Sequence, residues 1–337
     1  MEVFPEQRKN YKSVLAVRAN AVSDFRIDLA ARHLSKAGFE VEVITQVPFY
    51  KASQFDIIIC CRPGISMIEF LKVCLLAGKR VVVDLDDDFN AIPKHNPAYV
   101  YTGAGHPTYL YELKKLLNYP GVIVTYASAE LAKRYKVDGV VIPNYWDEEN
   151  PNWYIPKRTH PDYVTLGFSG TTTHREDFNI IEPALKKVFN DYPHLRFVSQ
   201  LDDSIYTRFL DLPEERKLFI PPLLYIDYPL MYSYIDILLV PLRDTHFNRA
   251  KSDIKLLECG ASKTPYVASD MPFYHDWGVG GGLVKTTDWD VALPSMVENW
   301  NPEVRQELGE QGHTKALTRT SAIVCNKWIE LVEELSQ

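Results

Sequence analysis

The sequence predicts an α/β protein built from two Rossmann-like domains that face each other across a cleft. Short β-branched runs alternate with segments of helical period along almost the whole chain, which favours parallel sheets covered by helices on both faces. The alternation stops once, near Trp146, in a stretch rich in proline and charge, and then resumes as a second series of similar size. A chain of 337 residues is long enough for two such domains.

The first series predicts six strands, with amphipathic helices between them. The strands are expected at 13–17 (SVLAV), 41–45 (VEVIT), 56–61 (DIIICC), 80–85 (RVVVDL), 121–126 (GVIVTY) and 139–143 (GVVIP). Segments 24–36 and 65–77 have the apolar spacing of helices.

The second series predicts six more strands. They are expected at 163–169 (YVTLGFS), 195–200 (LRFVSQ), 217–221 (KLFIP), 236–241 (DILLVP), 265–269 (PYVAS) and 281–286 (GGLVKT), with helices at about 177–191 and 252–262. The resulting division is a first domain at 1–148, a linker at 149–162, a second domain at 163–320 and a C-terminal helix at 321–337 that is free to cross back to the first domain.

Composition argues against several classes of protein, including nucleic-acid-binding, disulfide-bonded and membrane-spanning ones. The net charge is −7, and no long Lys/Arg run indicates a sequence-independent grip on nucleic acid. Five cysteines in apolar surroundings indicate reduced thiols. The first residues lack the layout of a signal peptide, and no apolar run approaches the roughly 20 residues of a membrane span. We expect a soluble cytoplasmic protein, with peripheral membrane contact left open.

Four aspartates follow a buried strand in the stretch VVVDLDDDF. Asp84, Asp86, Asp87 and Asp88 lie within five positions. Such a cluster is suited to hold a divalent metal, to supply a nucleophile with its acid partner, or to line a sugar pocket without metal. The residues alone leave these three interpretations open. His95 and His106, in the loop that follows, are secondary candidates.

The most informative stretch for function is 237–270. A strand ends at Pro241, a polar loop follows, and Ser252 is placed to cap a helix that contains Glu258. Lys251 and Lys255 add positive charge to the helix N-terminus, which predicts a binding site for a diphosphate. Glu258 is placed to accept hydrogen bonds from vicinal hydroxyls. An ordinary amphipathic helix with solvated lysines is the alternative.

The stretch KSDIKLLECGASKTPYVASD resembles the donor-binding region of GT-B glycosyltransferases of the family 4 type, in a variant found in phage and bacterial proteins. That family has a Glu, seven residues, a second Glu, a run of small residues and then PVVAS. Glu258 matches the second Glu, and the resemblance implies that it binds the ribose of a nucleotide sugar. Ala250 stands where the family has its first Glu, so the contact of that Glu with the transferred sugar passes to a neighbour or is lost.

Two further stretches carry the resemblance. Segment 164–178 (VTLGFSGTTTHREDF) is similar to the first strand and glycine turn of the donor domain. The resemblance implies that its turn residues lie near the phosphates: Gly170, Thr171, Thr173, His174 and Arg175. Segment 124–147 is similar to the end of the acceptor domain, with Asn144 in the turn toward the linker.

The first strand departs from the family. In place of a Gly-rich turn the chain has Asn20, Ser23 and Arg26, and we expect Arg26 to point into the cleft on the acceptor side. The aspartates also fit two other patterns. Asp84 as nucleophile and Asp86 as acid match Mg²⁺-dependent phosphohydrolases like haloacid dehalogenase, and the run matches the Asp-X-Asp metal motif of GT-A enzymes.

The resemblance implies a retaining, metal-independent glycosyltransferase of the hexosyltransferase class (EC 2.4) that needs no cofactor and uses a UDP- or GDP-sugar. Asp84, Asp86 and Asp87 are then the catalytic candidates, and Asp88 contacts the acceptor. The expected acceptor is a glycan, a lipid-linked glycan or a small molecule; a modified nucleobase in DNA is disfavoured because residues 1–150 are neutral, with 18 Lys and Arg against 18 Asp and Glu. The alternatives are a nucleotide-sugar epimerase, the phosphohydrolase, and an inactive nucleotide-sugar binding protein.

Overall fold

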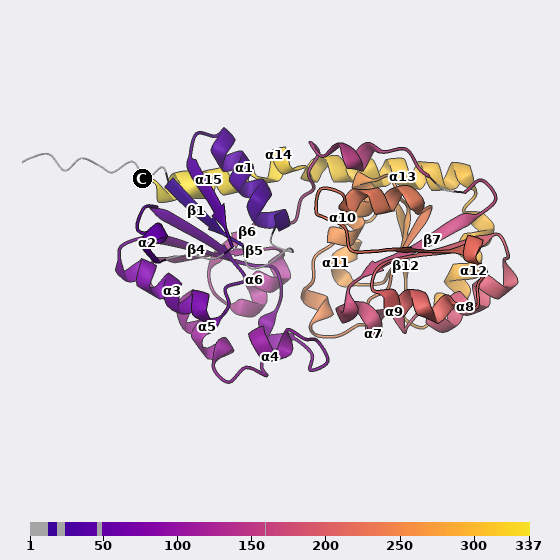
Figure 1. The fold of residues 1–337 in the computed structure, drawn as a ribbon, viewed down its shortest axis with the longest axis horizontal. Helices are drawn as coiled ribbons and strands as arrows, with labels where there is room; N and C mark the ends of the chain where they lie inside the picture. The colour runs from indigo at the N-terminus through magenta and orange to yellow at the C-terminus, as the bar shows by residue number, and fades with distance from the viewer. Residues whose placement is uncertain (1–12, 19–23, 46–48, 159) are drawn as a thin grey trace, which may run out of the picture. The chain divides into compact units, whose positions relative to one another are not determined.

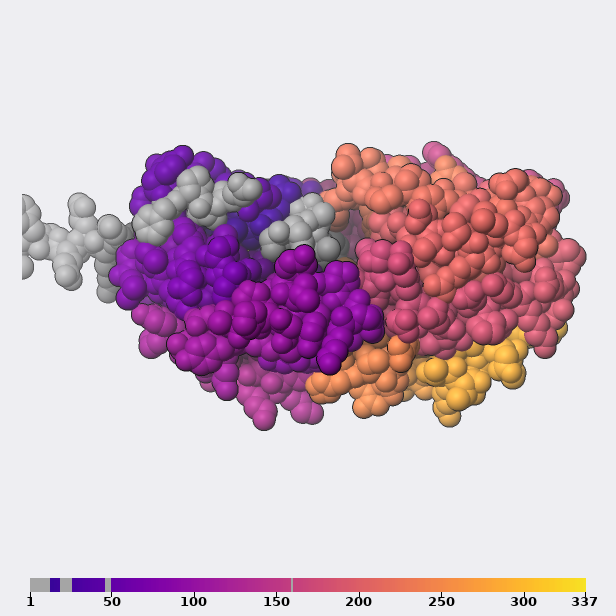
Figure 2. All heavy atoms as spheres, turned by 60° about the horizontal axis from the view of Figure 1, so that its bottom comes forward, coloured from indigo at the N-terminus to yellow at the C-terminus, as the bar shows by residue number. Residues whose placement is uncertain are grey.

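The computed structural model describes residues 13–18, 24–45, 49–158 and 160–337. Figures 1 and 2 draw the other residues in grey. The chain forms two compact units, each an α/β layer structure. The first contains residues up to Asn90, Val100–Pro143 and Ala322–Gln337, and the second contains Ala91–Tyr99 and Asn144–Ser321. Segments 91–99 and 149–162 therefore group with the second unit.

The first unit is built on a six-stranded parallel sheet of order β2-β1-β3-β4-β5-β6. Its strands are β1 (Ser13–Val17), β2 (Glu40–Ile44), β3 (Ile57–Cys61), β4 (Arg80–Leu85), β5 (Val122–Tyr126) and β6 (Gly139–Val141). All six predicted strands are present. Strands β3 and β4 are buried along nearly their whole length, as expected of central strands covered on both faces.

Helices cover both faces of this sheet. The helical segments of this part of the chain are the π-helix η1 (Asp24–Asp28), α1 (Leu29–Lys36), α2 (Phe49–Ala52), α3 (Ile65–Leu76), the 3₁₀ turn η2 (Phe89–Ala91), α4 (Tyr99–Thr102), α5 (Tyr109–Leu117) and α6 (Ala129–Tyr135). Figure 1 shows α1 on one side and α3 with α5 on the other.

The C-terminal helix returns to the first unit, one of the placements that the sequence leaves open. After α14 (Ser321–Val324), α15 (Asn326–Leu335) packs against α1 and buries an apolar stripe that includes Trp328 and Leu331. Lys327 Nζ also donates to the carbonyl oxygen of Val141, at 3.1 Å. The helix lies there because one of its faces is apolar and must be covered.

The second unit has a six-stranded parallel sheet of order β12-β11-β10-β7-β8-β9. Its strands are β7 (Val164–Gly170), β8 (Leu195–Leu201), β9 (Lys217–Ile220), β10 (Ile237–Val240), β11 (Tyr266–Ser269) and β12 (Gly281–Val284). The strand order reverses between the neighbours β7 and β10. In open α/β sheets, ligands bind outside the carboxyl ends of the strands at such a reversal.

The helices of the second unit form two layers around separate apolar cores. Helix α10 (Ile254–Ala261) contributes to one core, and α8 (Glu182–Asp191) and α12 (Trp289–Asn299) contribute to the other. The remaining segments are η3 (Pro151–Tyr154), η4 (Thr172–His174), α7 (Arg175–Phe178), α9 (Asp203–Tyr206), η5 (Thr207–Phe209), η6 (Glu214–Arg216), η7 (Tyr228–Tyr234), η8 (Asn248–Ala250), α11 (Pro272–His275), α13 (Pro302–Ala316) and η9 (Leu317–Arg319).

Two predicted helices of this unit need correction. The helix expected at 177–191 is two helices, α7 and α8, and Pro183 lies in the first turn of α8, where its missing N–H does no harm. The helix expected from Ser252 begins at Ile254. Helix α10 packs closely on α13, since a Cβ added to Gly260 would lie 2.5 Å from the carbonyl oxygen of Gly312. The small residues after Glu258 therefore serve this close approach.

A buried ion pair ties η1, β4 and β5 together in the first unit. Asp84 has no exposed surface, and Arg26 is 2% exposed. Arg26 donates from Nε to Asp84 Oδ2 at 2.7 Å and from Nη2 to Oδ1 at 2.8 Å, and Thr125 Oγ1 donates to Oδ1 at 2.7 Å. Arg26, expected to point toward substrate, is instead an interior partner of Asp84.

Removing one member of this pair should destabilise the first unit strongly. Arg26→Met leaves the Asp84 charge buried without its partner, for which we expect a loss of about 3–5 kcal/mol in the free energy of unfolding. The double variant Arg26→Met/Asp84→Leu should recover most of the loss, because no uncompensated charge remains. Urea unfolding measures both; a single variant within about 1 kcal/mol of the wild type would contradict the assignment.

Candidate active site

The candidate site of the second unit lies where the strand order reverses. Strand β7 ends at Gly170 and leads into η4 and α7, while β10 ends at Val240 and leads through a polar loop into η8. Both turns follow the carboxyl ends of paired strands, so they lie side by side.

Asp177 joins these two turns. Its Oδ2 is 2.9 Å from His174 Nδ1, and its Oδ1 accepts from the Arg243 backbone N–H and from Asn248 Nδ2, both at 2.9 Å. The side chain is almost fully buried. Sequence reasoning missed Asp177 and Asn248, although an acidic residue three positions after His174 on a helical turn is a detectable signal.

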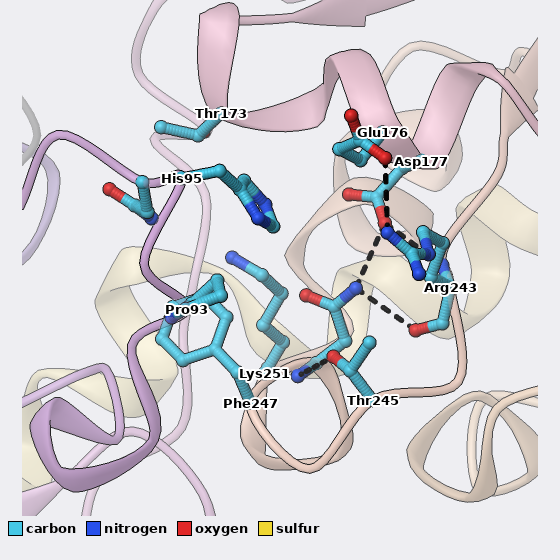
Figure 3. Close-up of a pocket in the computed structure, with 11 residues that line it drawn as sticks. Pro93, His95, Thr173, Glu176, Asp177, Arg243, Thr245, Phe247 and Lys251 are labelled. Carbon is cyan, nitrogen blue, oxygen red and sulfur yellow. Dashed lines mark hydrogen bonds and ion pairs between the residues drawn. The ribbon is translucent and has the colours of Figure 1, made fainter. Parts of the chain in front are cut away.

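A small pocket lies against this crosslink (Figure 3). Eleven residues line it: Pro93, His95, Asn96, Thr173, Glu176, Asp177, Arg243, Thr245, Phe247, Asn248 and Lys251. Figure 3 shows the Lys251 side chain rising beside Phe247 toward His95, and its ammonium is 4.8 Å from the centre of the Phe247 ring. Of the predicted donor-binding residues, Thr173 and Lys251 line this pocket.

Glu258 is held by three donors on one oxygen. Its Oε2 accepts from Tyr232 Oη at 2.8 Å, from Tyr228 Oη at 3.1 Å and from Lys255 Nζ at 3.1 Å. Oε1 accepts no hydrogen bond from any described residue. The two tyrosines lie on η7, four positions apart, and sequence reasoning missed them because nothing local links that turn to α10.

The start of α10 differs from expectation. Its N-cap is Asp253, whose carboxylate receives a hydrogen bond from Arg319 Nη1 at 2.6 Å and makes no cap hydrogen bond to the helix. Ser252, predicted to be the cap, lies before it and accepts from Asn144 Nδ2 at 2.6 Å. Asn144, predicted on the acceptor side, therefore lies beside the start of α10, and its own carbonyl oxygen accepts from Arg319.

The glycine turn has a tight geometry. A Cβ at Gly170 would lie 2.9 Å from His174 Cβ and from the Phe168 ring, so only glycine fits there without rearrangement. The hydroxyls of Thr171 and Thr173 are 2.8 Å apart. Arg175 does not line the pocket: its guanidinium donates to both oxygens of Asp202, at 2.6 and 3.0 Å.

Each aspartate of the run in the first unit is paired with an arginine, with three arginines for the four carboxylates. Arg62, at φ 49° just after β3, pairs with Asp86 through Nε and with Asp87 through Nη2, the latter at 2.9 Å. Burial raises the pKa of Asp86, an effect that the Arg62 charge opposes. Asp88 is 2% exposed and pairs with Arg134 at 2.9 Å.

These contacts bear on the alternative interpretations that the sequence leaves open for the aspartate run. Asp84 is enclosed and hydrogen-bonded on both oxygens, so it cannot serve as the exposed nucleophile that the phosphohydrolase interpretation requires. Among the residues described, no three His, Cys, Asp or Glu side chains are grouped to hold a metal ion. Asn20 and Ser23 lie outside the described residues.

Comparison with known proteins supports the architecture. No family model matches the chain. The O-antigen chain mannosyltransferase RfbU of Salmonella typhimurium is 27% identical over 173 residues, which are 50% of this chain and 47% of RfbU. The chain thus matches about half the length of this curated relative.

Solved structures resemble nearly the whole chain. Alr3699/HepE of Anabaena, in complex with UDP and glucose, has a TM-score of 0.69 at 15% identity and covers 96% of this chain and 100% of its own. A Listeria monocytogenes protein assigned as a UDP-N-acetylglucosamine 2-epimerase has a TM-score of 0.59 at 9% identity, with 96% of each chain covered. At these identities the likeness shows the fold, which is GT-B. None of the described helices combines the length and apolar character needed to cross a bilayer.

His174 should be neutral at pH 7. Burial lowers the pKa of its imidazole below the usual value of about 6.5, and Lys251 and Lys255 lower it further, while Asp177 opposes the shift. Since the unfolded chain then binds more protons, His174 costs stability as pH falls below about 6.5.

NMR titration of the imidazole should therefore give a midpoint below 6.5, and a lower one still in Asp177→Asn. Replacing the imidazole in His174→Asn should flatten the fall in stability between pH 6.5 and 5. A midpoint at or above 6.5 in the wild type would overturn this assignment.

Proposed function

We propose that this protein is a glycosyltransferase that moves a sugar from a nucleotide diphosphate sugar to an acceptor hydroxyl. The observation that carries the proposal is the site at the strand reversal of the second unit, where Lys251 and Thr173 line a pocket, together with Glu258, seven positions after Lys251, whose Oε1 accepts no hydrogen bond from a described residue. The likeness to RfbU, named a mannosyltransferase, and to HepE, solved with UDP and glucose, supports it.

In this proposal the donor diphosphate lies against the glycine turn and Lys251. Backbone N–H groups of the turn after Gly170, the Thr173 hydroxyl and the Lys251 ammonium suit phosphate oxygens. The ribose hydroxyls bind Glu258. A UDP- or GDP-sugar matches both halves of the site, and the positive charge of Lys251 stabilises the departing diphosphate without a metal ion.

The pocket has a volume of only about 40 Å³, room for about three water molecules. A nucleotide sugar is much larger, so its binding displaces segment 91–99, which contributes Pro93, His95 and Asn96 to the lining. His95 is then a candidate contact for the donor, and its proximity to Lys251 in Figure 3 is the reason.

The acceptor side of the proposal rests on Asp86 and Asp87. These two keep some exposed surface, whereas Asp84 and Asp88 are buried and hold Arg26 and Arg134. A carboxylate with a raised pKa, such as Asp86, is suited to take a proton from an acceptor hydroxyl. Transfer with retention, by same-face attack assisted by the leaving phosphate, follows from the family 4 resemblance.

The acceptor class and the compartment are part of the same proposal. We expect a glycan, a lipid-linked glycan or a small molecule as acceptor. The five cysteines are all free and buried, which suits a reducing compartment such as the cytoplasm.

A nucleotide-sugar epimerase is the second candidate, since the Listeria protein shares the fold. It would use the same donor seat and release an isomer of the donor instead of a glycoside. Because Ala250 replaces the first Glu of the family pattern, an inactive nucleotide-sugar binding protein is a third candidate. Product analysis by NMR separates the three outcomes.

Two substitutions test the donor seat. With nucleotide sugars in EDTA, Glu258→Ala and Lys251→Ala should each weaken donor binding by about tenfold or more, because each removes a hydrogen bond that involves a charged group. The rate of donor hydrolysis should fall together with the donor affinity in both variants.

Glu310→Ala and Lys263→Ala are matched controls, since these residues form an exposed ion pair away from the pocket and should bind donor like the wild type. An activity that strictly requires Mg²⁺, in a protein that binds no nucleotide sugar, would contradict the proposal.

A further inference from the structure

Two lysines flank the start of α10, and the structure assigns them different tasks. We propose that Lys255, linked through Tyr228, is a positioning residue for Glu258 and not a ligand of the diphosphate, so that Glu258 Oε1 alone receives the ribose hydroxyls. This inference rests on the proposed function and goes beyond it, because the sequence places both lysines at the diphosphate.

The contacts of Lys255 lead to Glu258. Its ammonium donates to Tyr228 Oη at 2.6 Å and to Glu258 Oε2 at 3.1 Å, which uses two of its three hydrogens. Of the two lysines, only Lys251 lines the pocket. Burial by itself would lower the pKa of Lys255, but Glu258 and Tyr228 raise it above its ordinary value, so the lysine stays charged beside the carboxylate.

Oxygen Oε2 of Glu258 is already filled. Tyr228, Tyr232 and Lys255 all donate to it within 3.1 Å, and an oxygen atom with two lone pairs has no capacity left for a ligand. Oε1 has no partner among the described residues. The three donors thus hold the carboxylate by one oxygen and leave the other for the ribose.

The burial of Glu258 explains why its carboxylate needs Lys255. Glu258 is only 8% exposed, and a buried carboxylate needs a countercharge and hydrogen bonds to stay ionised and in one rotamer. Without Lys255, its two tyrosine hydroxyls remain, but the charge loses its compensation. The ribose contact should therefore weaken, while Lys251 keeps its hold on the phosphates.

Two affinity ratios separate ribose recognition from phosphate recognition. UDP and GDP are compared first, and the nucleotide that binds more tightly is chosen. Its 2′,3′-dideoxy diphosphate and its monophosphate are then measured beside it. Calorimetry gives a ribose ratio, the affinity for the diphosphate over that for the dideoxy diphosphate, and a phosphate ratio, the affinity for the diphosphate over that for the monophosphate.

We expect Lys255→Met to reduce the ribose ratio about tenfold and to leave the phosphate ratio within twofold. Tyr228→Phe should reduce the ribose ratio by a smaller factor, again without changing the phosphate ratio. Lys251→Met is the matched control, and it should lower the phosphate ratio and keep the ribose ratio.

Each contrary result has a separate meaning. A fall in the phosphate ratio of Lys255→Met with an unchanged ribose ratio would make Lys255 a diphosphate ligand and overturn the inference, as would a wild-type ribose ratio of one. A wild type that binds neither UDP nor GDP removes the proposed function itself. Thermal unfolding checks that the variants fold. If Lys255→Met does not fold, the ribose and phosphate ratios of Tyr228→Phe test the inference instead.

Discussion

The pocket at the strand reversal of the second unit depends first on one buried carboxylate, that of Asp177. It links the turn after β7, through His174, to the loop after β10, through the Arg243 backbone and Asn248. These are the two strands between which the sheet reverses its order. The exposed pair of Arg243 Nη1 and Glu176 Oε2, at 3.1 Å, joins the same two segments, but Asp177 makes the buried contacts between them.

A second constraint is charge compensation in low-dielectric surroundings. The aspartate run of the first unit looks like a metal site in the sequence, yet each carboxylate has an arginine: Arg26 for Asp84, Arg62 for Asp86 and Asp87, and Arg134 for Asp88. In the second unit Lys255 does the same for Glu258. Buried charge is costly unless it is paired, and these pairs also hold side chains in fixed rotamers.

The fold was accessible from sequence to a large extent. All twelve strands and the two parallel sheets follow from local apolar periodicity, because a parallel strand buried on both faces is apolar at nearly every residue. Periodicity also predicts the C-terminal helix, but only the tertiary structure decided that it packs on the first unit. Helix starts were less accessible: Ser252 has the residue type of a cap, but Asp253 holds the position and pairs with Arg319, which is far away in the chain.

By itself the sequence determined the architecture, since the strands and their alternation with helices rest on apolar periodicity. The proposal of Lys251, Thr173 and Glu258 as donor ligands rests on motif order and on the resemblance to GT-B enzymes. Tertiary structure alone decided which charges meet: that Arg26 holds Asp84, that Arg175 turns to Asp202, and that Tyr228 and Tyr232 reach Glu258. Such pairs join residues 26 to 58 positions apart. A hydrogen bond depends on where the chain crossings place two atoms, and no local pattern records that.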